Sequence, residues 1–199
     1  AEIEWGHPLA TGLVFCFLFN ESGGSELHDM TGFPRATITD AGVTLTASAL
    51  GLGFSSAVTV STTRGATLAP AFTYTANTQM TWETRLRDAG SDTYGTIFGA
   101  AATTGIYINL QKLSVFFASL LSTTAPTLGT VQHWLASVNP IVANVIYLNG
   151  VADASNAGLT SGGAFDEMLN DILSETFVGD CEFQRVWNRP LSAGEALWL

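Results

Sequence analysis

The sequence predicts an all-β protein, an antiparallel sandwich that closes with a short C-terminal helix. Three observations support this fold class. About a dozen short segments rich in Val, Ile, Thr, Phe and Tyr are separated by Gly, Pro, Asn and Ser. The clearest of these segments alternate apolar and polar residues with the period of two that a strand requires. Helical patterns are nearly confined to two places near the C-terminus.

The N-terminal part of the chain divides into an arm and a first strand. Residues 1–12 are expected to form the arm, and residues 13–199 a single sandwich domain. Leu13–Phe19 is a nearly continuous apolar run, as expected for a strand buried on both faces, and a turn cluster at 20–24 ends it. Between 36 and 79, short Val, Thr and Leu segments alternate with Gly, Ser and Pro, which indicates edge strands and long loops.

The segment 80–88 carries the clearest alternation in the chain. Its apolar positions are expected to form one buried face: Met80, Trp82 and Leu86. Its charged positions are expected to face solvent: Glu83, Arg85 and Arg87. Successive side chains of a strand point to opposite sides of a sheet, so this pattern predicts a half-buried strand.

The remaining strands follow in short order. They are expected at 96–100, 132–139 and 182–187. Residues 105–117 supply two strands joined near position 111. Residues 144–151 predict a hairpin, because Asn149 and Gly150 accept the positive φ values of a type I′ turn.

Two segments have helical character. Residues 165–173 are expected to form a short helix. Ser192 and Glu195 have the spacing of a capping box, with Pro190 before them, and therefore predict a helical turn at the C-terminus.

The low content of charge limits the function classes. Charged residues make up 12% of the chain, against roughly 25% in ordinary soluble domains. The net charge of −10 and the scattered arginines exclude nucleic acid as a partner, since such binding needs clustered Lys and Arg. No membrane partner is expected either, because the purest apolar run, Val115–Leu121, is far too short to span a bilayer. Either the faces of the domain are covered by neighbours, or a neutral, hydroxyl-rich sheet is exposed.

Six segments in order resemble laminin-G-like, concanavalin-A-like domains. They are GLVFCFLFNESGGSELHDMTG (12–32), MTWETRLRD (80–88) with GTIFGA (95–100), GIYINLQKLSVFFA (105–118), GTVQHWLASVN (129–139), NVIYLNGV (144–151) and DCEFQRVWNRPLSAGEALWL (180–199). The resemblance implies a jelly roll of two antiparallel sheets in which the first and last strands lie side by side. It would bring Cys16 near Cys181, and a disulfide between them is left open.

The segment from Trp5 to Val14 resembles laminin-G-like proteins encoded by tailed bacteriophages. It implies a non-catalytic virion structural protein, a capsid decoration or appendage component located in the virion. Its partners would be other virion proteins and further copies of this chain. The low charge and the lack of a signal peptide at the first residues agree with this expectation. The alternative is a carbohydrate-binding, lectin-like module that recognises a glycan on a host surface.

Catalysis is not expected, and no catalytic residue is assigned. Glycosidases of this fold need two carboxylates placed together, and the alternation Glu-x-Asp-x-Glu is absent. Glu83 and Glu182 are single acids on strands and are expected to face water beside Arg85 or Arg185. A further acidic group is expected to form a solvated face: Asp166, Glu167, Asp171 and Glu175.

Metal and sugar sites have candidates by residue type only. The three histidines, His7, His28 and His133, lack metal-ligand spacing, and His133 is expected to be a packed or hydrogen-bonded structural residue. No cofactor is expected; candidate Ca²⁺ ligands by type alone are Asp29, Asp40, Asp153 and Asp180. Exposed aromatic side chains can stack on sugars, but these four are interpreted as ordinary surface residues: Trp5, Tyr74, Tyr94 and Tyr107. Tryptophans expected in the core are Trp82, Trp134 and Trp187.

Overall fold

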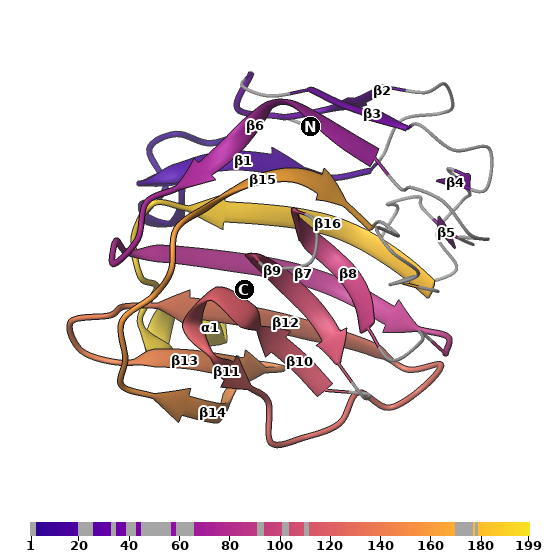
Figure 1. The fold of residues 1–199 in the computed structure, drawn as a ribbon. Helices are drawn as coiled ribbons and strands as arrows, with labels where there is room; N and C mark the ends of the chain where they lie inside the picture. The colour runs from indigo at the N-terminus through magenta and orange to yellow at the C-terminus, as the bar shows by residue number, and fades with distance from the viewer. Residues whose placement is uncertain are drawn as a thin grey trace.

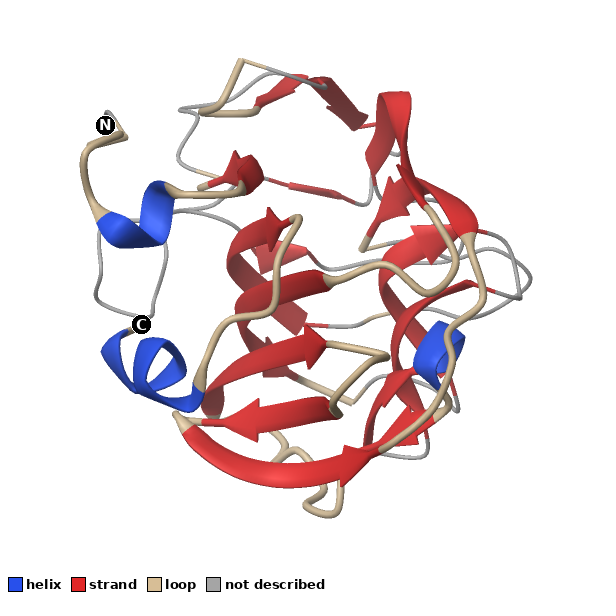
Figure 2. Ribbon diagram, turned by 90° about the vertical axis from the view of Figure 1, so that its left-hand side faces the viewer, coloured by secondary structure: helices blue, strands red, loops and turns tan. Residues whose placement is uncertain are grey.

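Two antiparallel sheets face each other across an aromatic core (Figures 1 and 2). The computed structural model describes residues 3–19, 26–32, 35–38, 43–44, 57–58, 66–90, 94–100, 104–109, 112–169, 177 and 179–199. The all-β sandwich with a short C-terminal helix is therefore confirmed.

Sheet A runs in the order β14-β13-β12-β7-β16-β5-β4, and β1 also pairs with β16. Its strands are β1 (Leu13–Phe17), β4 (Val43–Thr44), β5 (Ala57–Val58), β7 (Met80–Asp88), β12 (Val131–Val138), β13 (Asn144–Leu148), β14 (Val151–Asn156) and β16 (Gly179–Trp187). The pairing of β1 with β16 confirms that the first and last strands are neighbours.

Sheet B runs in the order β11-β10-β9-β8-β15-β6-β3-β2. Its strands are β2 (Glu26–His28), β3 (Arg35–Ile38), β6 (Ala66–Tyr74), β8 (Tyr94–Ala100), β9 (Thr104–Asn109), β10 (Lys112–Val115), β11 (Leu120–Leu121) and β15 (Gly163–Met168). The described helices are η1 (Pro8–Ala10), η2 (Phe116–Ala118) and α1 (Ala193–Trp198). Among the described residues, no helix has the length and apolar character needed to cross a membrane.

The core between the sheets is built from the inward-facing residues of each strand. Met80, Trp82 and Leu86 of β7 are buried there, as the alternation predicts. Trp134 joins them from β12, and the rings of Phe98 and Phe165 stack 4.8 Å apart in sheet B. Trp187 is buried too, but in a separate cluster on the outer face of sheet A, with Leu135, Tyr147, Leu191 and Ala196.

The two ends of the chain cover part of that outer face. Figure 2 shows η1 and α1 on the same side of the sandwich, outside sheet A. The indole Nε1 of Trp187 donates to Leu9 O at 2.6 Å, and Arg189 Nε donates to Thr11 O at 2.8 Å. The N-terminal arm thus packs on its own chain, and the division of the chain at residue 12 stays a prediction.

Two local predictions about turns and caps are confirmed. Asn149 (φ 50°) and Gly150 (φ 78°) form the turn between β13 and β14. At α1, Glu195 N donates to Ser192 Oγ, and Ser192 N donates to Glu195 Oε2, which is the reciprocal capping box. Residues 104–109 and 112–115 form two paired antiparallel strands, as predicted, and the expected junction near position 111 lies outside the described residues.

The structure differs from the sequence prediction at the helix expected over 165–173 and at Glu83. Residues 163–168 form β15 and not the start of a helix, while 170–176 lie outside the described residues. The pairing of β15 with β6 is irregular between Phe165 and Glu167, and Phe165 and Met168 both reach the core, so their spacing of three imitates a helix. Glu83 does not face solvent; it is fully buried on the outer face of sheet A.

Cys16 and Cys181 are free thiols and do not form a disulfide with each other. Their strands are neighbours, but Cys181 lies in the core between the sheets. Cys16 packs on the other face of sheet A with Leu18 and Phe183. Opposite faces of one sheet are incompatible with the geometry of a disulfide.

Candidate functional site

Buried glutamates beneath arginines mark the outer face of sheet A. The carboxylate of Glu83, on β7, contacts side chains from both neighbouring strands. His133 Nε2 on β12 lies 2.8 Å from Glu83 Oε1, and Arg185 NH1 on β16 lies 3.3 Å from Glu83 Oε2. The strand register places Arg185 directly opposite Glu83, whereas His133 is opposite Arg85 and reaches Glu83 diagonally across β7 and β12.

A second pair lies beside the first. A β-bulge between Cys181 and Phe183 places Glu182 with its Oε2 3.4 Å from Arg85 Nε. Glu182 is fully buried, as Glu83 is. The sequence therefore predicts that these acids lie beside arginines but misses their burial. A third pair, Arg87 with Asp180, lies further along the same two strands.

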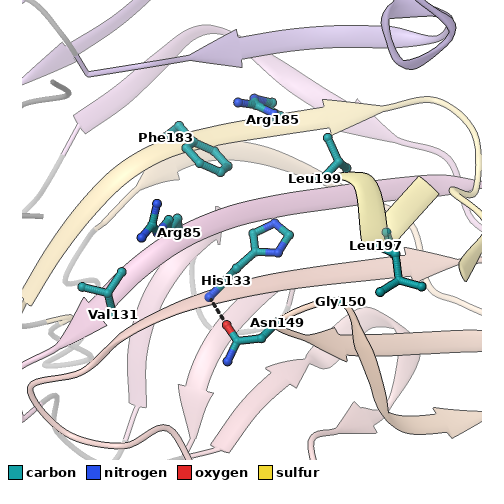
Figure 3. A pocket seen from close by; sticks show the side chains of 10 residues that line it. Arg85, Val131, His133, Asn149, Gly150, Phe183, Arg185, Leu197 and Leu199 are labelled. Carbon is teal, nitrogen blue, oxygen red and sulfur yellow. Dashed lines mark hydrogen bonds between the residues drawn. The ribbon is translucent and has the colours of Figure 1, made fainter. Parts of the chain in front are cut away.

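A hollow of about 420 Å³ opens above Glu83 and the two arginines that line it (Figure 3). Its floor comes from β7, β12 and β16, and its walls from the β13–β14 turn and the C-terminal residues. The lining residues are Arg85, Val131, His133, Asn149, Gly150, Phe183, Arg185, Ala196, Leu197 and Leu199. This volume is within the range of small-molecule sites in proteins.

Arg85 and Arg185 are the cationic side chains of the hollow. They are 31% and 25% exposed, whereas the glutamates that hold them are at most 1% exposed. The guanidinium carbon of Arg185 lies 4.3 Å from the ring centre of Phe183, a cation–π contact that fixes its plane. Figure 3 shows the Phe183 side chain between the two arginines.

The wall of the hollow is set by close packing of the turn against α1. Asn149 Oδ1 accepts from the backbone N–H of His133 at 3.0 Å, which ties the turn to β12. A Cβ at Gly150 would lie 3.3 Å from Leu197 Cδ2 and 3.4 Å from Ala196 O. Glycine at this position therefore serves both the turn conformation and the approach of α1.

The aspartates that were candidate Ca²⁺ ligands by type alone make other contacts where the structure describes them. Asp29 Oδ1 accepts from the backbone N–H of Cys16 at 2.6 Å, and Asp153 accepts from the N–H groups of Thr123 and Thr124. Asp180 pairs with Arg87, and Asp40 lies outside the described residues. Over the described ranges, no three His, Cys, Asp or Glu side chains are grouped as metal ligands.

The other candidates are dispersed. Tyr74 and Tyr107 are buried, so the interpretation of these two as surface aromatics is wrong. Trp5 is 60% exposed, and the side chain of Tyr94 is not described. Trp82, Trp134 and Trp187 are buried, as predicted. His7 accepts from Leu9 N through Nδ1, His28 is exposed on β2, and His133 is the hydrogen-bonded structural residue that was predicted. Of the four predicted acids, Asp166 lies on β15 with Glu167, and Asp171 and Glu175 lie outside the described residues.

Comparison with known proteins relates this chain to solved structures alone. No protein-family model matches it, and no curated protein sequence does. Domain 4 of AbnA, a GH43 extracellular arabinanase from Geobacillus stearothermophilus in complex with arabinotriose, superposes with a TM-score of 0.66 at 17% identity. That match covers 93% of this chain and 96% of the domain.

Trypanosoma rangeli sialidase superposes with a TM-score of 0.64 at 13% identity over 94% of this chain, which spans 32% of the sialidase. At these identities the likeness shows the fold. The protein has the two-sheet antiparallel β-sandwich fold of these structures.

Proposed function

We propose that the protein is a non-catalytic carbohydrate-binding module and that the hollow on sheet A is its binding site. The observation that carries this proposal is the placement of Arg85 and Arg185. Both open into the hollow and are held from beneath by fully buried glutamates. Side chains held in this way on strands are preorganised donors for ligand oxygens. A structural neighbour in complex with arabinotriose supports the choice of carbohydrate.

Binding without hydrolysis follows from the burial of the two acids. A glycosidase needs one carboxyl group to protonate the leaving oxygen and another to attack or activate water, both beside the sugar. Glu83 and Glu182 lie beneath the arginines and have no exposed surface. The carboxylate of Glu83 contacts Arg185 and His133, and that of Glu182 contacts Arg85. Neither acid therefore reaches a sugar in the hollow.

A glycan array followed by calorimetry tests the proposal with a variant that fills the hollow. Val131 lies at the rim, so Val131→Trp should reduce binding of any positive glycan by at least about tenfold, a change of about 1.4 kcal/mol. Val151→Trp is the matched control, because Val151 is 67% exposed on β14 and does not line the hollow. Equal loss in both variants, or no binding on the array, would refute the site. Reducing-end assays should remain at background.

We propose a second role, as a structural protein of a tailed-bacteriophage virion. Supporting it are the low charge and large apolar side chains left exposed near the chain ends: Trp5 at 60%, Leu197 at 68% and Trp198 at 81%. Tryptophan is enriched at protein–protein contacts. Sedimentation velocity should show concentration-dependent association that Trp5→Ser with Trp198→Ser weakens. A monomer at every concentration, together with no binding to virus particles, would count against this role.

A further inference from the structure

We propose that the sugar bound in the hollow carries a carboxylate, held by the guanidinium groups of Arg85 and Arg185. This inference rests on the proposed function, because it names the class of glycan for the same site. The partner is defined by chemistry, as an oligosaccharide that contains a sugar acid.

The guanidinium groups of Arg85 and Arg185 supply the charged donors that face the hollow. Arg85 directs Nε toward Glu182, and Arg185 directs one terminal nitrogen toward Glu83 and also contacts the Cys16 thiol. A guanidinium has five N–H groups in a rigid plane, so each arginine keeps terminal donors for a ligand. Planar pairs of N–H groups match the two oxygens of a carboxylate, which a neutral hydroxyl cannot reproduce.

Two glutamates, Glu83 and Glu182, are fully buried on the outer face of sheet A. Stability of the fold alone does not explain them, since well-packed apolar residues often stabilise a protein as much as a buried ion pair does. A glutamate beneath an arginine instead fixes the direction of its guanidinium. Glu83 and Glu182 do this for the two arginines that line the hollow. Phe183 adds a further constraint on Arg185 by stacking.

Cationic side chains are rare in this chain, which has seven Lys and Arg residues and a net charge of −10. Two of the seven, Arg85 and Arg185, line one hollow with His133 beside them. The buried Glu83 and Glu182 balance their charges, so the hollow offers directed N–H donors of two guanidinium groups and not a net positive charge. Since charge-assisted hydrogen bonds are about twice as strong as neutral ones, a carboxylate uses these donors best.

Isothermal titration with matched ligand pairs tests the inference. The probes are trigalacturonate, a hyaluronan tetrasaccharide and 3′-sialyllactose, each beside its own methyl ester, which has the same sugar rings without the charge. At least one acid should bind about tenfold or more tighter than its ester at low salt, with the difference reduced as salt rises. Equal binding of acid and ester overturns the inference and leaves the proposed function intact. No binding of any glycan, charged or neutral, overturns both.

Paired substitutions assign the effect to the arginines without leaving a buried acid alone. Arg85→Met with Glu182→Met removes one pair as a unit and should reduce the ratio of acid to ester affinity to about one. Arg87→Met with Asp180→Met is the matched control, because this pair lies on the same strands but does not line the hollow. If the first double variant fails to fold, Arg85→Lys keeps the charge, loses the planar fork and should lower the ratio several-fold. An unchanged ratio in the variant that folds overturns the inference.

Discussion

Glu83 shows how far a single side chain can depart from the pattern of its strand. It stands at a polar position of β7, yet it is fully buried between His133 and Arg185. Its carboxylate is removed from water, so its hydrogen bonding and the balance of its charge depend on those two contacts. The arginine and histidine depend on it in turn, so the three side chains form one unit.

Replacing Glu83 alone should therefore be costly. Glu83→Leu leaves Arg185 and His133 without their acceptor, and we expect a loss of about 3–5 kcal/mol in the free energy of unfolding. Urea denaturation followed by tryptophan fluorescence measures it. Glu83→Gln, which keeps an acceptor oxygen, should lose less. A loss below about 1 kcal/mol for the leucine variant would mean that the contacts contribute little.

The two thiols should be unreactive in the folded protein. Burial raises the pKa of Cys16 from 9.0 to about 11 and that of Cys181 to about 12. Because the thiolate is the nucleophile, reaction with Ellman's reagent at pH 8 should be slow until the protein unfolds. After unfolding in denaturant without reductant, two thiols per chain should react at once. Fewer than two would reveal a disulfide and contradict the separation of the cysteines.

The C-terminal helix depends on an acid that is strongly held. A hydrogen bond from Arg189, with smaller contributions from Ser192, lowers the pKa of Glu195 from 4.5 to about 2. A carboxyl whose folded-state pKa is depressed adds stability at pH values above its unfolded pKa, and this stability is lost as the pH falls through the folded value.

Glu195→Gln should therefore lower the melting temperature at pH 7 and make no difference near pH 2. The gap between wild type and variant should close across the window from pH 4.5 down to about 2. Differential scanning calorimetry at several pH values measures it. A gap that stays constant with pH would show that the charge of Glu195 is not the cause.

The start of β16 depends on the absence of a side chain. A Cβ at Gly179 would lie 2.0 Å from Arg87 O on β7. Gly179→Ala must push the two strands apart, and we expect a loss of about 1–3 kcal/mol or more. Gly158→Ala is the control, since a Cβ there meets nothing within 4 Å. Similar unfolding midpoints in urea for the two variants would contradict the close approach.

Elements whose signal is local could be predicted from the sequence. The alternation of 80–88, the Asn149–Gly150 turn and the capping box of α1 each depend on neighbours along the chain. The strand β15 could not be predicted, because Phe165 and Met168 both reach the core and their spacing of three imitates a helix. The shift of register depends on pairing with β6, which the segment itself does not encode.

The candidate site could be predicted only in part, for a reason that belongs to the whole molecule. The sequence places Glu83, Glu182 and the arginines on strands and indicates that they pair. The walls around them come from Asn149 and Gly150 and from Ala196, Leu197 and Leu199, which are far away in sequence. Alternation tells which side of a strand is polar but not what covers that side, so burial of the glutamates was missed.

At the scale of the whole fold, β16 holds sheet A together. It pairs with β7 along one side and with β1 and β5 along the other. A chain that ends at residue 178 should therefore fail to form the sandwich, whereas a chain that lacks only 193–199 should keep it with a lower melting temperature. Near-ultraviolet circular dichroism and limited proteolysis distinguish the two. A protease-resistant core in the shorter chain would contradict the central role of β16.

The position of β16 also fixes the order of events during synthesis. Among the described strands, β1 is synthesised first and β16 last, at about 5–20 residues per second. Until β16 emerges, the edges of β1 and β7 that it will cover stay open, with apolar side chains exposed beside them. Sheet A is completed only after β16 leaves the exit tunnel, so the nascent domain should depend on holdase chaperones until then.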